Sequence, residues 1–292
     1  MVAEKNNTMY KKRTTSAYVF VWETVENVTW IYSLYENGNV TKMRKVSLIL
    51  TTYNSKENFL KTYKSIRQQD YPDIEIVVVD GGSTDGTVAE IQKCAGWEAG
   101  RLKWISEKDH GIYDAINKGI HLASGDLIAV FNDIFYTNFA ISKLVQAINH
   151  DGGYDGAHGD LIYCQNGKVK RYWKMGEGLI EKGWMPAHPT LLLKREVYER
   201  YGVYKTDYKC SSDYEFMVRI LKDGGVRLAY VPEILVSMFY GGTSSNGIKA
   251  YAVSFMEACR ALKENGIKHS YLISIRRTYK VFKQFLSGNK KK

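Results

Sequence analysis

Acidic and amide side chains stand directly after two apolar runs of the sequence. Asp80 follows residues 74–79, and Asn132 and Asp133 follow residues 127–131. A carboxylate at the end of a strand, with an acidic or amide group beside it, can hold Mg²⁺ or Mn²⁺ through oxygen ligands. Such a metal ion usually completes its coordination shell with substrate phosphates. These positions are therefore candidates for binding a phosphorylated ligand through a divalent metal ion.

The segment after Asp80 is rich in small residues and reads Gly-Gly-Ser-Thr-Asp-Gly. The two glycines let the backbone turn tightly or approach a ligand. Ser83 or Thr84 can cap the helix that we expect to start near Thr87. Asp80 therefore either contacts a ligand or only closes this turn.

Residues 46–133 alternate apolar runs with amphipathic segments, which is typical of a doubly wound, mostly parallel α/β sheet. The expected buried strands are residues 46–50, 74–79, 102–105 and 127–131. In such a sheet, ligands bind beyond the carboxyl ends of the strands. The polar residues at these ends are Thr51, Tyr53, Asp80, Asn132 and Asp133. The sequence thus gathers its candidate ligands along one edge.

The rest of the chain is less regular. We expect a strand pair around residues 166–167, where Asn-Gly is a turn signal, and a helix at residues 195–201. An N-cap at Ser212 or Asp213 precedes a further apolar-periodic segment. Before the sheet, residues 18–22 and 28–32 look like two strands, with a turn at residues 37–39. This N-terminal extension, residues 1–45, suggests no function.

Composition limits the class of protein. The chain has 292 residues and a formal net charge of +10, which suits a nucleic acid, an anionic membrane surface or an anionic substrate. No apolar run reaches eighteen residues, and no apolar leader is visible at the N-terminus. The four cysteines form no C-x-x-C pair, which argues against zinc and against a disulfide framework. Free thiols fit a reducing cytoplasm.

Two nucleotide-binding signatures are missing. The sequence has no G-x-x-x-x-G-K-[ST] and no G-x-G-x-x-G after its first expected strand. This excludes a P-loop protein and disfavours a dinucleotide oxidoreductase. A nucleotidyltransferase is also disfavoured, because no glycine-rich loop with Arg or Lys follows that strand.

Six segments, in order, resemble glycosyltransferase family 2, nucleotide-sugar enzymes of the GT-A fold that build bacterial surface polysaccharides. The segments are VSLILTTYN (46–54), VVVDGGSTDGT (77–87), WISEKDHGIYDAINKG (104–119), GDLIAVFND (125–133), MPAHPT (185–190) and SSDYEF (211–216). The resemblance runs from about residue 45 to the end. It implies a GT-A domain at 46–248, with a nucleotide-binding half at 46–133 and an acceptor half at 134–248. Residues 249–292 read as a basic helical region from their own pattern.

The resemblance assigns the donor site. Thr51, Tyr53 and Asp80 look like the pocket for the base and ribose, and Asp109 and Asp114 look like further donor contacts. The expected donor is a nucleotide-diphosphate sugar, with a UDP-sugar favoured. Alternatively, Asp80 only closes the glycine turn, and Asp114 only lies on a solvent-exposed helix face.

The resemblance also assigns the catalytic side. Asp133 looks like the ligand of Mn²⁺ or Mg²⁺, and Asp213 like the general base of an inverting transfer. His188, between two prolines, would face the acceptor or the diphosphate. The alternatives are a turn residue at Asp133, an N-cap at Asp213 and a structural histidine at 188.

The sequence departs from the family pattern at two positions. Asn132 stands where a second carboxylate is usual, so it can bind a donor or metal only through its amide, and Gly81 replaces a second aspartate of some relatives. The main expectation is transfer of a sugar to a saccharide or lipid-linked saccharide in the cytoplasm. The alternative is a non-catalytic relative that binds nucleotide sugars.

The C-terminal region suggests where the chain resides. Its basic and apolar residues fit either an amphipathic helix on the anionic inner face of the membrane or a docked helix with a frayed end. We expect no nucleic-acid partner.

Overall fold

The computed structural model describes residues 44–98, 100–150, 153–165, 168–239 and 248–288, and four strands before residue 44. Those strands are β1 (Thr8–Arg13), β2 (Tyr18–Glu23), β3 (Ser33–Glu36) and β4 (Asn39–Lys42). They pair in chain order as an antiparallel sheet within the unit Met1–Lys45. The strand expected at residues 18–22 lies in β2, whereas residues 28–32 and 37–38 lie outside the described residues.

The second unit, Val46–Lys292, begins with the alternation that the sequence predicts. Its first elements are β5 (Val46–Thr52), α1 (Lys56–Arg67), β6 (Ile74–Asp80), α2 (Thr87–Trp97), β7 (Leu102–Ser106), α3 (Ile112–Leu122) and β8 (Leu127–Val130). The four predicted strands and the helices between them are therefore confirmed. Strands β5, β6 and β8 are almost wholly buried, as expected for a parallel sheet that is covered on both faces.

The remainder of this unit mixes short elements with a long strand pair. After β8 come β9 (Ile134–Phe135), α4 (Ala140–Asn149), β10 (Gly156–Gln165), β11 (Lys168–Trp173), the 3₁₀ turns η2 (Ile180–Lys182) and η3 (His188–Thr190), β12 (Leu192–Lys194), α5 (Arg195–Tyr201), α6 (Ser212–Leu221), η4 (Lys222–Gly224), β13 (Leu228–Phe239), α7 (Ile248–Glu264) and α8 (Ser270–Gly288). The predicted hairpin is β10 with β11, and the predicted helix at 195–201 is α5. The C-terminal helical region forms two helices, α7 and α8.

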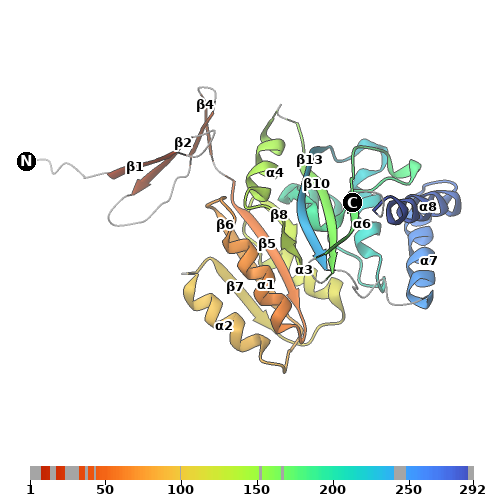
Figure 1. The fold of residues 1–292 in the computed structure, drawn as a ribbon, viewed down its shortest axis with the longest axis horizontal. Coiled ribbons are helices and arrows are strands. Elements are labelled where there is room, and N and C mark those ends of the chain that lie inside the picture. Colours follow the sequence, from red (N-terminus) through yellow and green to blue (C-terminus); the bar gives the residue numbers. More distant parts are fainter. Residues whose placement is uncertain are drawn as a thin grey trace, which may run out of the picture. The chain divides into compact units, whose positions relative to one another are not determined.

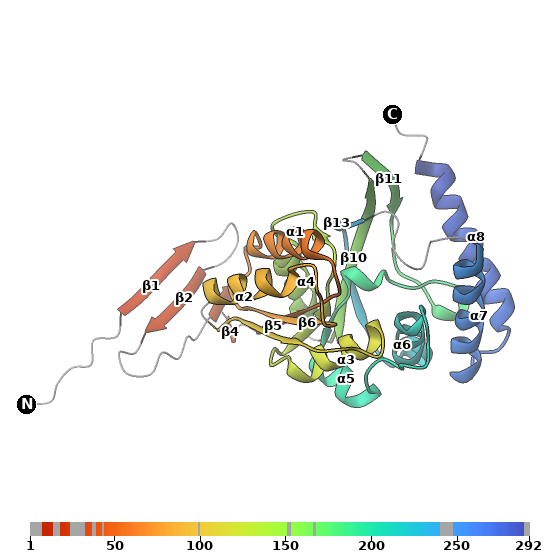
Figure 2. The same cartoon turned by 90° about the horizontal axis from the view of Figure 1, so that it is seen from below.

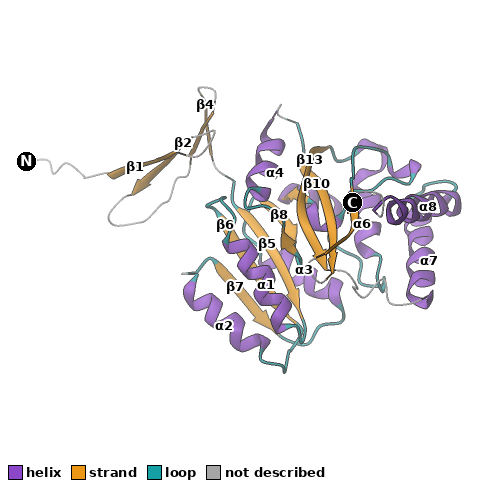
Figure 3. Ribbon diagram, viewed as in Figure 1, coloured by secondary structure: helices purple, strands orange, loops and turns teal. Residues whose placement is uncertain are grey.

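One nine-stranded sheet runs through this unit (Figure 1 and Figure 3). Its order is β7-β6-β5-β8-β12-β10-β13-β9, and β11 pairs with β10. Strands β7, β6, β5 and β8 are parallel, β12 is antiparallel to both neighbours, and β10 and β13 are parallel to each other. Because β12 is reversed between β8 and β10, the carboxyl ends of β6, β5, β8, β10 and β13 share one edge.

Helices cover both faces of this sheet (Figure 2). Helices α1 and α2 lie on one face, and α3 and α5 lie on the opposite face, with α6 beside α3. Helix α3 packs on β5 and β6, so that its first turn lies close to the edge where the strands end. This arrangement brings α3 and α6, from the two halves of the sequence, to the same edge of the sheet.

A single core joins the two halves of the sheet. Buried side chains from both halves pack together, and they include Ile49, Val77, Ile116, Ile128, Leu193, Val197, Phe216 and Met217. Arg195, the first residue of α5, donates to the carbonyl oxygens of Gly125 and Ala123 at 2.8 and 2.9 Å. The loop after α3 is thereby tied to the acceptor half.

A second cluster of buried side chains fixes the C-terminal helices to α6. It contains Tyr208, Tyr214, Val218, Ala258, Ala261, Leu262 and Ile273. In the described part of the chain, no helix combines the length and the apolar character needed to cross a membrane.

Candidate active site

Asp80 ends β6 and is completely buried. Its Oδ2 accepts hydrogen bonds from the backbone N–H groups of Gly82 (3.0 Å) and Ser83 (2.9 Å) and from Ser106 Oγ (2.7 Å). Its Oδ1 accepts from Ser83 Oγ at 2.5 Å. The carboxylate therefore holds the glycine turn against the end of β7, as the structural alternative for Asp80 describes.

The helix after this turn starts differently from the prediction. Gly86, with φ of 90°, is the N-cap of α2, so a cap at Ser83 or Thr84 is wrong. Asp85 Oδ1 instead accepts from the backbone N–H of Thr87 at 3.0 Å, and its Oδ2 accepts from that of Lys56 at 3.2 Å. Asp85 thus links the beginnings of α2 and α1.

Tyr53 and Asp109 flank the backbone of Gly81. A Cβ added at Gly81 would lie 2.9 Å from Asp109 Oδ2 and 3.3 Å from Tyr53 Cδ2. The Tyr53 side chain is 65% exposed, and Asp109 is only partly exposed. An open aromatic ring beside a carboxylate can stack on a planar base and accept hydrogen bonds from hydroxyl groups. The absence of a side chain at residue 81 is what leaves room for both.

Lys118 of α3 binds the two predicted donor contacts, Asp109 and Asp114, and was not among the residues predicted from the sequence. Its Nζ lies 2.8 Å from Glu107, 3.0 Å from Asp109 and 3.3 Å from Asp114. Hydrogen bonds to these carboxylates raise the pKa of Lys118, so it stays charged. Asp114 also accepts from the backbone N–H of His110 at 3.0 Å, and this bond and Lys118 lower the pKa of Asp114. The i, i+4 spacing of Asp114 and Lys118 was the available sequence signal.

Asn132 and Thr51 bind each other across the ends of β8 and β5. Asn132 Oδ1 accepts from the backbone N–H of Thr51 at 2.8 Å, and Asn132 Nδ2 donates to Thr51 Oγ1 at 2.8 Å. Both ends of the amide are therefore engaged with β5. Next to it, Asp133 is 8% exposed and comes directly before β9.

Asp213 is the second residue of α6, whose N-cap is Ser211. The prediction of an N-cap at Ser212 or Asp213 is therefore wrong by one or two residues. Tyr113, in the first turn of α3, donates its hydroxyl to Asp213 Oδ1 at 3.3 Å. Burial raises the pKa of Tyr113 and the charge of Asp213 raises it further, so this phenol remains a donor.

His188 is linked to the same carboxylate through Tyr204 and Tyr113. Its Nε2 is 2.7 Å from the hydroxyl of Tyr204, and its ring meets the Tyr204 ring edge-on. Burial lowers the pKa of His188, while Asp213 is near enough to raise it in part. Tyr204 in turn stacks on Tyr113, with ring centroids 6.2 Å apart. His188 is thus a neutral imidazole held by Tyr204, which stacks on the tyrosine that donates to Asp213.

Tyr163 lies near the carboxyl end of β10 and stacks on Trp173 of β11. Burial raises its pKa, Arg171 lowers it, and the charges of Asp133 and Asp213 both raise it. The charges of both carboxylates therefore reach this phenol. The sequence reasoning missed Tyr163, although it stands at a strand's carboxyl end like the other candidates.

Residues 47–210 match the glycosyl transferase family 2 domain. The chain belongs to this family. An uncharacterized glycosyltransferase of Mycobacterium tuberculosis is 31% identical over 187 residues, which cover 62% of this chain and 70% of the relative. A GalNAc(5)-diNAcBac-PP-undecaprenol beta-1,3-glucosyltransferase of Campylobacter jejuni is 29% identical over 166 residues, 56% of this chain and 52% of the relative.

Solved structures of glycosyltransferases share the fold. A mannosyltransferase from Pyrobaculum calidifontis, in complex with GDP-Man and Mn²⁺, superposes with a TM-score of 0.60 and 20% identity, over 85% of this chain and 74% of its own. Residues 1–349 of TarS from S. aureus, in complex with UDP-GlcNAc, give 0.62 and 18%, over 82% and 73%. The family 2 domain therefore has the predicted GT-A fold.

Asp133 is the carboxylate of this family 2 domain that would hold a divalent metal ion. Among the described residues, no three His, Cys, Asp or Glu side chains converge on one point. Asp133 offers a carboxylate, and the Asn132 amide beside it is turned to Thr51. A single carboxylate fits Mg²⁺ or Mn²⁺ only when substrate phosphates and water supply the other ligands.

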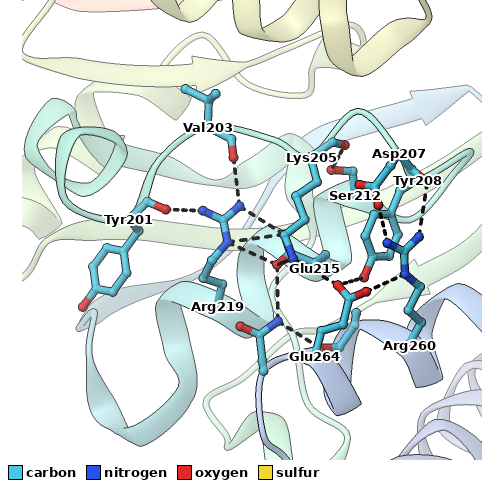
Figure 4. Close-up of polar contacts among 12 residues, drawn as sticks. Tyr201, Val203, Lys205, Asp207, Tyr208, Ser212, Glu215, Arg219, Arg260 and Glu264 are labelled. Carbon is cyan, nitrogen blue, oxygen red and sulfur yellow. Dashed lines mark hydrogen bonds and ion pairs between the residues drawn. The ribbon is translucent and has the colours of Figure 1, made fainter.

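A polar network holds the helix that carries Asp213 (Figure 4). Buried Glu215 of α6 binds Arg219 at 3.0 Å and Lys205 at 3.1 Å, and Arg219 also donates to the carbonyl oxygen of Val203 at 2.8 Å. Glu264 of α7 binds Lys205 at 3.0 Å from the other side. One set of ion pairs thus fixes α6 to the preceding loop and to α7.

Proposed function

We propose that this chain transfers a sugar, with inversion, from a nucleotide-diphosphate donor to a saccharide or lipid-linked saccharide during surface-polysaccharide synthesis. The observation that carries the proposal is the meeting of the two halves at the carboxyl edge of the sheet: Asp133 follows β8 there, and Tyr113 of α3 donates to Asp213 of α6 at 3.3 Å. The carboxylate of Asp80 accepts hydrogen bonds from its own turn. In this proposal, Asp80 therefore holds the loop that contains Gly81 in place.

Asp213 is the general base in this proposal. It accepts the proton of the acceptor hydroxyl as that oxygen forms a bond to the anomeric carbon and the bond to the diphosphate oxygen breaks. Displacement in one step from the opposite side inverts the anomeric configuration. Tyr113 holds the Asp213 carboxylate through its hydrogen bond, and His188 is linked to Tyr113 through Tyr204.

Asp133 would hold Mn²⁺ or Mg²⁺ against the diphosphate. When bound, this ion offsets the negative charge that develops on the leaving nucleotide. The support is the position of Asp133 at the carboxyl edge of the sheet and the Mn²⁺ in the Pyrobaculum calidifontis mannosyltransferase complex.

The nucleotide would bind along the edge formed by β5, β6 and α3. Tyr53 offers a ring to the base, and Asp109 offers a carboxylate to the ribose, on either side of Gly81. Thr51 and Asp114 would line this pocket, with Lys118 near the phosphates. The complexes of similar folds with GDP-Man and UDP-GlcNAc support a nucleotide sugar, and a UDP-sugar is the donor we expect.

A lipid-linked acceptor would place the protein at the cytoplasmic face of the membrane. The Campylobacter jejuni relative acts on an undecaprenol-linked glycan by its name. Helix α8 exposes Tyr271, Leu272, Ile275 and Tyr279 on one side, with Arg276 next to them. Such a surface suits an anionic bilayer, because apolar side chains insert while basic ones meet the headgroups.

The decisive experiment measures nucleotide release from UDP-, GDP-, dTDP- and CMP-sugars with Mn²⁺ and a saccharide acceptor. Wild-type release that falls about 100-fold or more in Asp213→Asn supports the base, since general bases contribute roughly 10²–10⁴-fold. Asp207→Asn, at an exposed carboxylate, is the matched control. An Asp213→Asn variant as fast as wild type contradicts the base assignment.

One observation favours a second function. Because Asn132 is engaged with Thr51, only Asp133 remains as a metal ligand of the usual pair, which fits a protein that binds nucleotide sugars without turnover. Calorimetry with UDP and GDP separates the two. Binding that persists in chelator, without nucleotide release from any sugar donor, supports the non-catalytic function.

A further inference from the structure

Asp133 and Tyr163 lie on one face of the sheet, two strands apart. Tyr163 of β10 pairs with Met238 of β13, and Ile134 of β9 pairs with Ser237 of β13. Asp133 is one residue before Ile134, and Met238 is one residue after Ser237, so the antiparallel register places Asp133 opposite Met238. Neighbouring strands lie about 4.8 Å apart, so roughly 10 Å separates the backbones of Asp133 and Tyr163. Paired residues share a face, and both side chains point the same way.

Arg171 and Trp173 fix the ring of Tyr163. Arg171 of β11 pairs directly with Tyr163 and is 5% exposed. Its guanidinium carbon lies 4.9 Å from the centre of the Tyr163 ring and 4.8 Å from that of Trp173. The two rings are nearly parallel, at 12°, with centroids 6.5 Å apart. A buried guanidinium on two aromatic rings is a strong cation–π arrangement, so the phenol has little freedom to rotate away.

The hydroxyl end of Tyr163 is free for a ligand. Among the described residues, no hydrogen bond to this hydroxyl is found, and the strand register places its side chain on the face of the sheet that Asp133 shares. A neutral phenol is a hydrogen-bond donor. In the proposed function, the space between a metal-binding carboxylate and the general base holds the bond between sugar and diphosphate. A donor there faces the phosphate oxygen that leaves.

We propose that Tyr163 is a catalytic residue that donates a hydrogen bond to the departing diphosphate, and that Arg171 and Trp173 are its positioning residues. This inference rests on the proposed function. As the bond between the anomeric carbon and the phosphate oxygen breaks, its electron pair stays on that oxygen, and the acceptor's proton goes to Asp213. The hydrogen bond from Tyr163 strengthens as this negative charge grows, which stabilises the transition state more than the bound donor.

Tyr163→Phe tests the hydroxyl and keeps the ring. We expect kcat for nucleotide release to fall about 10- to 100-fold, the range for one hydrogen bond to a charged group. The affinity for UDP with Mn²⁺ should weaken less than tenfold, and the Tm should change by less than about 2 °C. Tyr172→Phe is the matched control, because Tyr172 is next to Arg171 on β11 and exposed, and it should behave as wild type.

Arg171→Lys tests the positioning role. Lysine keeps the charge but loses the planar contact with both rings. Tyr163 is then held less firmly, and we expect kcat to fall for that reason. The double variant Tyr163→Phe/Arg171→Lys should lose no more kcat than Tyr163→Phe alone, because both changes remove the same hydrogen bond. Losses that multiply in the double variant would overturn the positioning role.

The outcomes separate this inference from the proposed function. Wild-type nucleotide release that Tyr163→Phe leaves unchanged overturns the role of Tyr163 and leaves the proposed function in place. A wild-type protein that neither releases nucleotide from any sugar donor nor binds UDP or GDP overturns both.

Discussion

Tyr113 on α3 donates its hydroxyl to Oδ1 of Asp213 on α6, across 3.3 Å and 100 residues of sequence. The next residue on α3, Asp114, binds Lys118 and the backbone of His110 on the donor side. The first turn of α3 therefore contacts both the proposed nucleotide pocket and the proposed base. Any displacement of this turn moves both together.

Tyr113→Phe should lower kcat for sugar transfer about 5- to 10-fold, because one hydrogen bond to the carboxylate of Asp213 is lost. The Tm should remain within about 2 °C of wild type, since the ring still stacks on Tyr204. Steady-state kinetics and thermal melting check the two parts. A full loss of activity with an unchanged Tm would show that Tyr113 does more than hold Asp213.

Gly81→Ala should weaken binding of UDP with Mn²⁺ about tenfold, on the order of 1.4 kcal/mol. The new methyl group would lie 2.9 Å from Asp109 Oδ2 and must displace Asp109 or Tyr53. Calorimetry measures the affinity. The control is Gly96→Ala in α2, where nothing lies within 4 Å and the helix should gain roughly 0.5–1 kcal/mol of stability. Equal affinities in both variants would exclude Tyr53 and Asp109 from the pocket.

Glu215→Ala should lower the free energy of unfolding by about 3–5 kcal/mol, because Arg219 and Lys205 lose a buried partner. Urea denaturation measures this change. The control is Asp207→Ala, which removes an exposed carboxylate paired with Arg260 and should cost less than about 1 kcal/mol. Similar losses of unfolding free energy in both variants would mean that buried Glu215 contributes no more than exposed Asp207 to the network in Figure 4.

Glu75 should make the protein sensitive to acid. Burial raises its pKa, but bonds from Lys103, Ser124 and Ser47 outweigh this effect and lower the pKa to about 2. A depressed pKa stabilises the fold above the unfolded value of about 4.5, and the contribution of about 3 kcal/mol is lost as pH falls toward 2.

The measurement for Glu75 is the free energy of unfolding between pH 7 and pH 2. Glu75→Gln should be less stable at pH 7 and should lose less stability than wild type as the pH falls. Glu57→Gln, at an exposed carboxylate near Lys61, should follow the wild-type curve. A Glu75→Gln curve parallel to wild type would exclude Glu75 from the acid transition.

Local patterns were sufficient to predict the first half of the sheet. The runs at 46–50, 74–79, 102–105 and 127–131 are aliphatic, and helices separate them, so the alternation defines a parallel sheet. The helix starts were less predictable. Ser83 and Ser212 have the right side chains for an N-cap, but Gly86 and Ser211 occupy those positions. The hydroxyl of Ser83 instead bonds to Asp80, and that of Ser212 bonds to the carbonyl oxygen of Lys205.

Contacts between distant residues could not be predicted. Asn132 binds Thr51 because β5 and β8 pair in a register that brings Ile49 opposite Val130, and no local pattern states this register. Tyr163 was missed for the same reason. Its relation to Asp133 depends on how β9 and β10 pair with β13, which lies about 70 residues later in the chain.

The first half of the sheet depends on residues that are synthesised later. Strand β12 pairs with β8, and Arg195 donates to the loop after α3. Until the ribosome has made the acceptor half, one edge of β8 is unpaired. The carbonyl groups of Ala123 and Gly125 also lack their hydrogen bonds from Arg195. A translation product that stops at Asp133 lacks β12 and exposes that edge to other chains, so we expect the first half alone to aggregate.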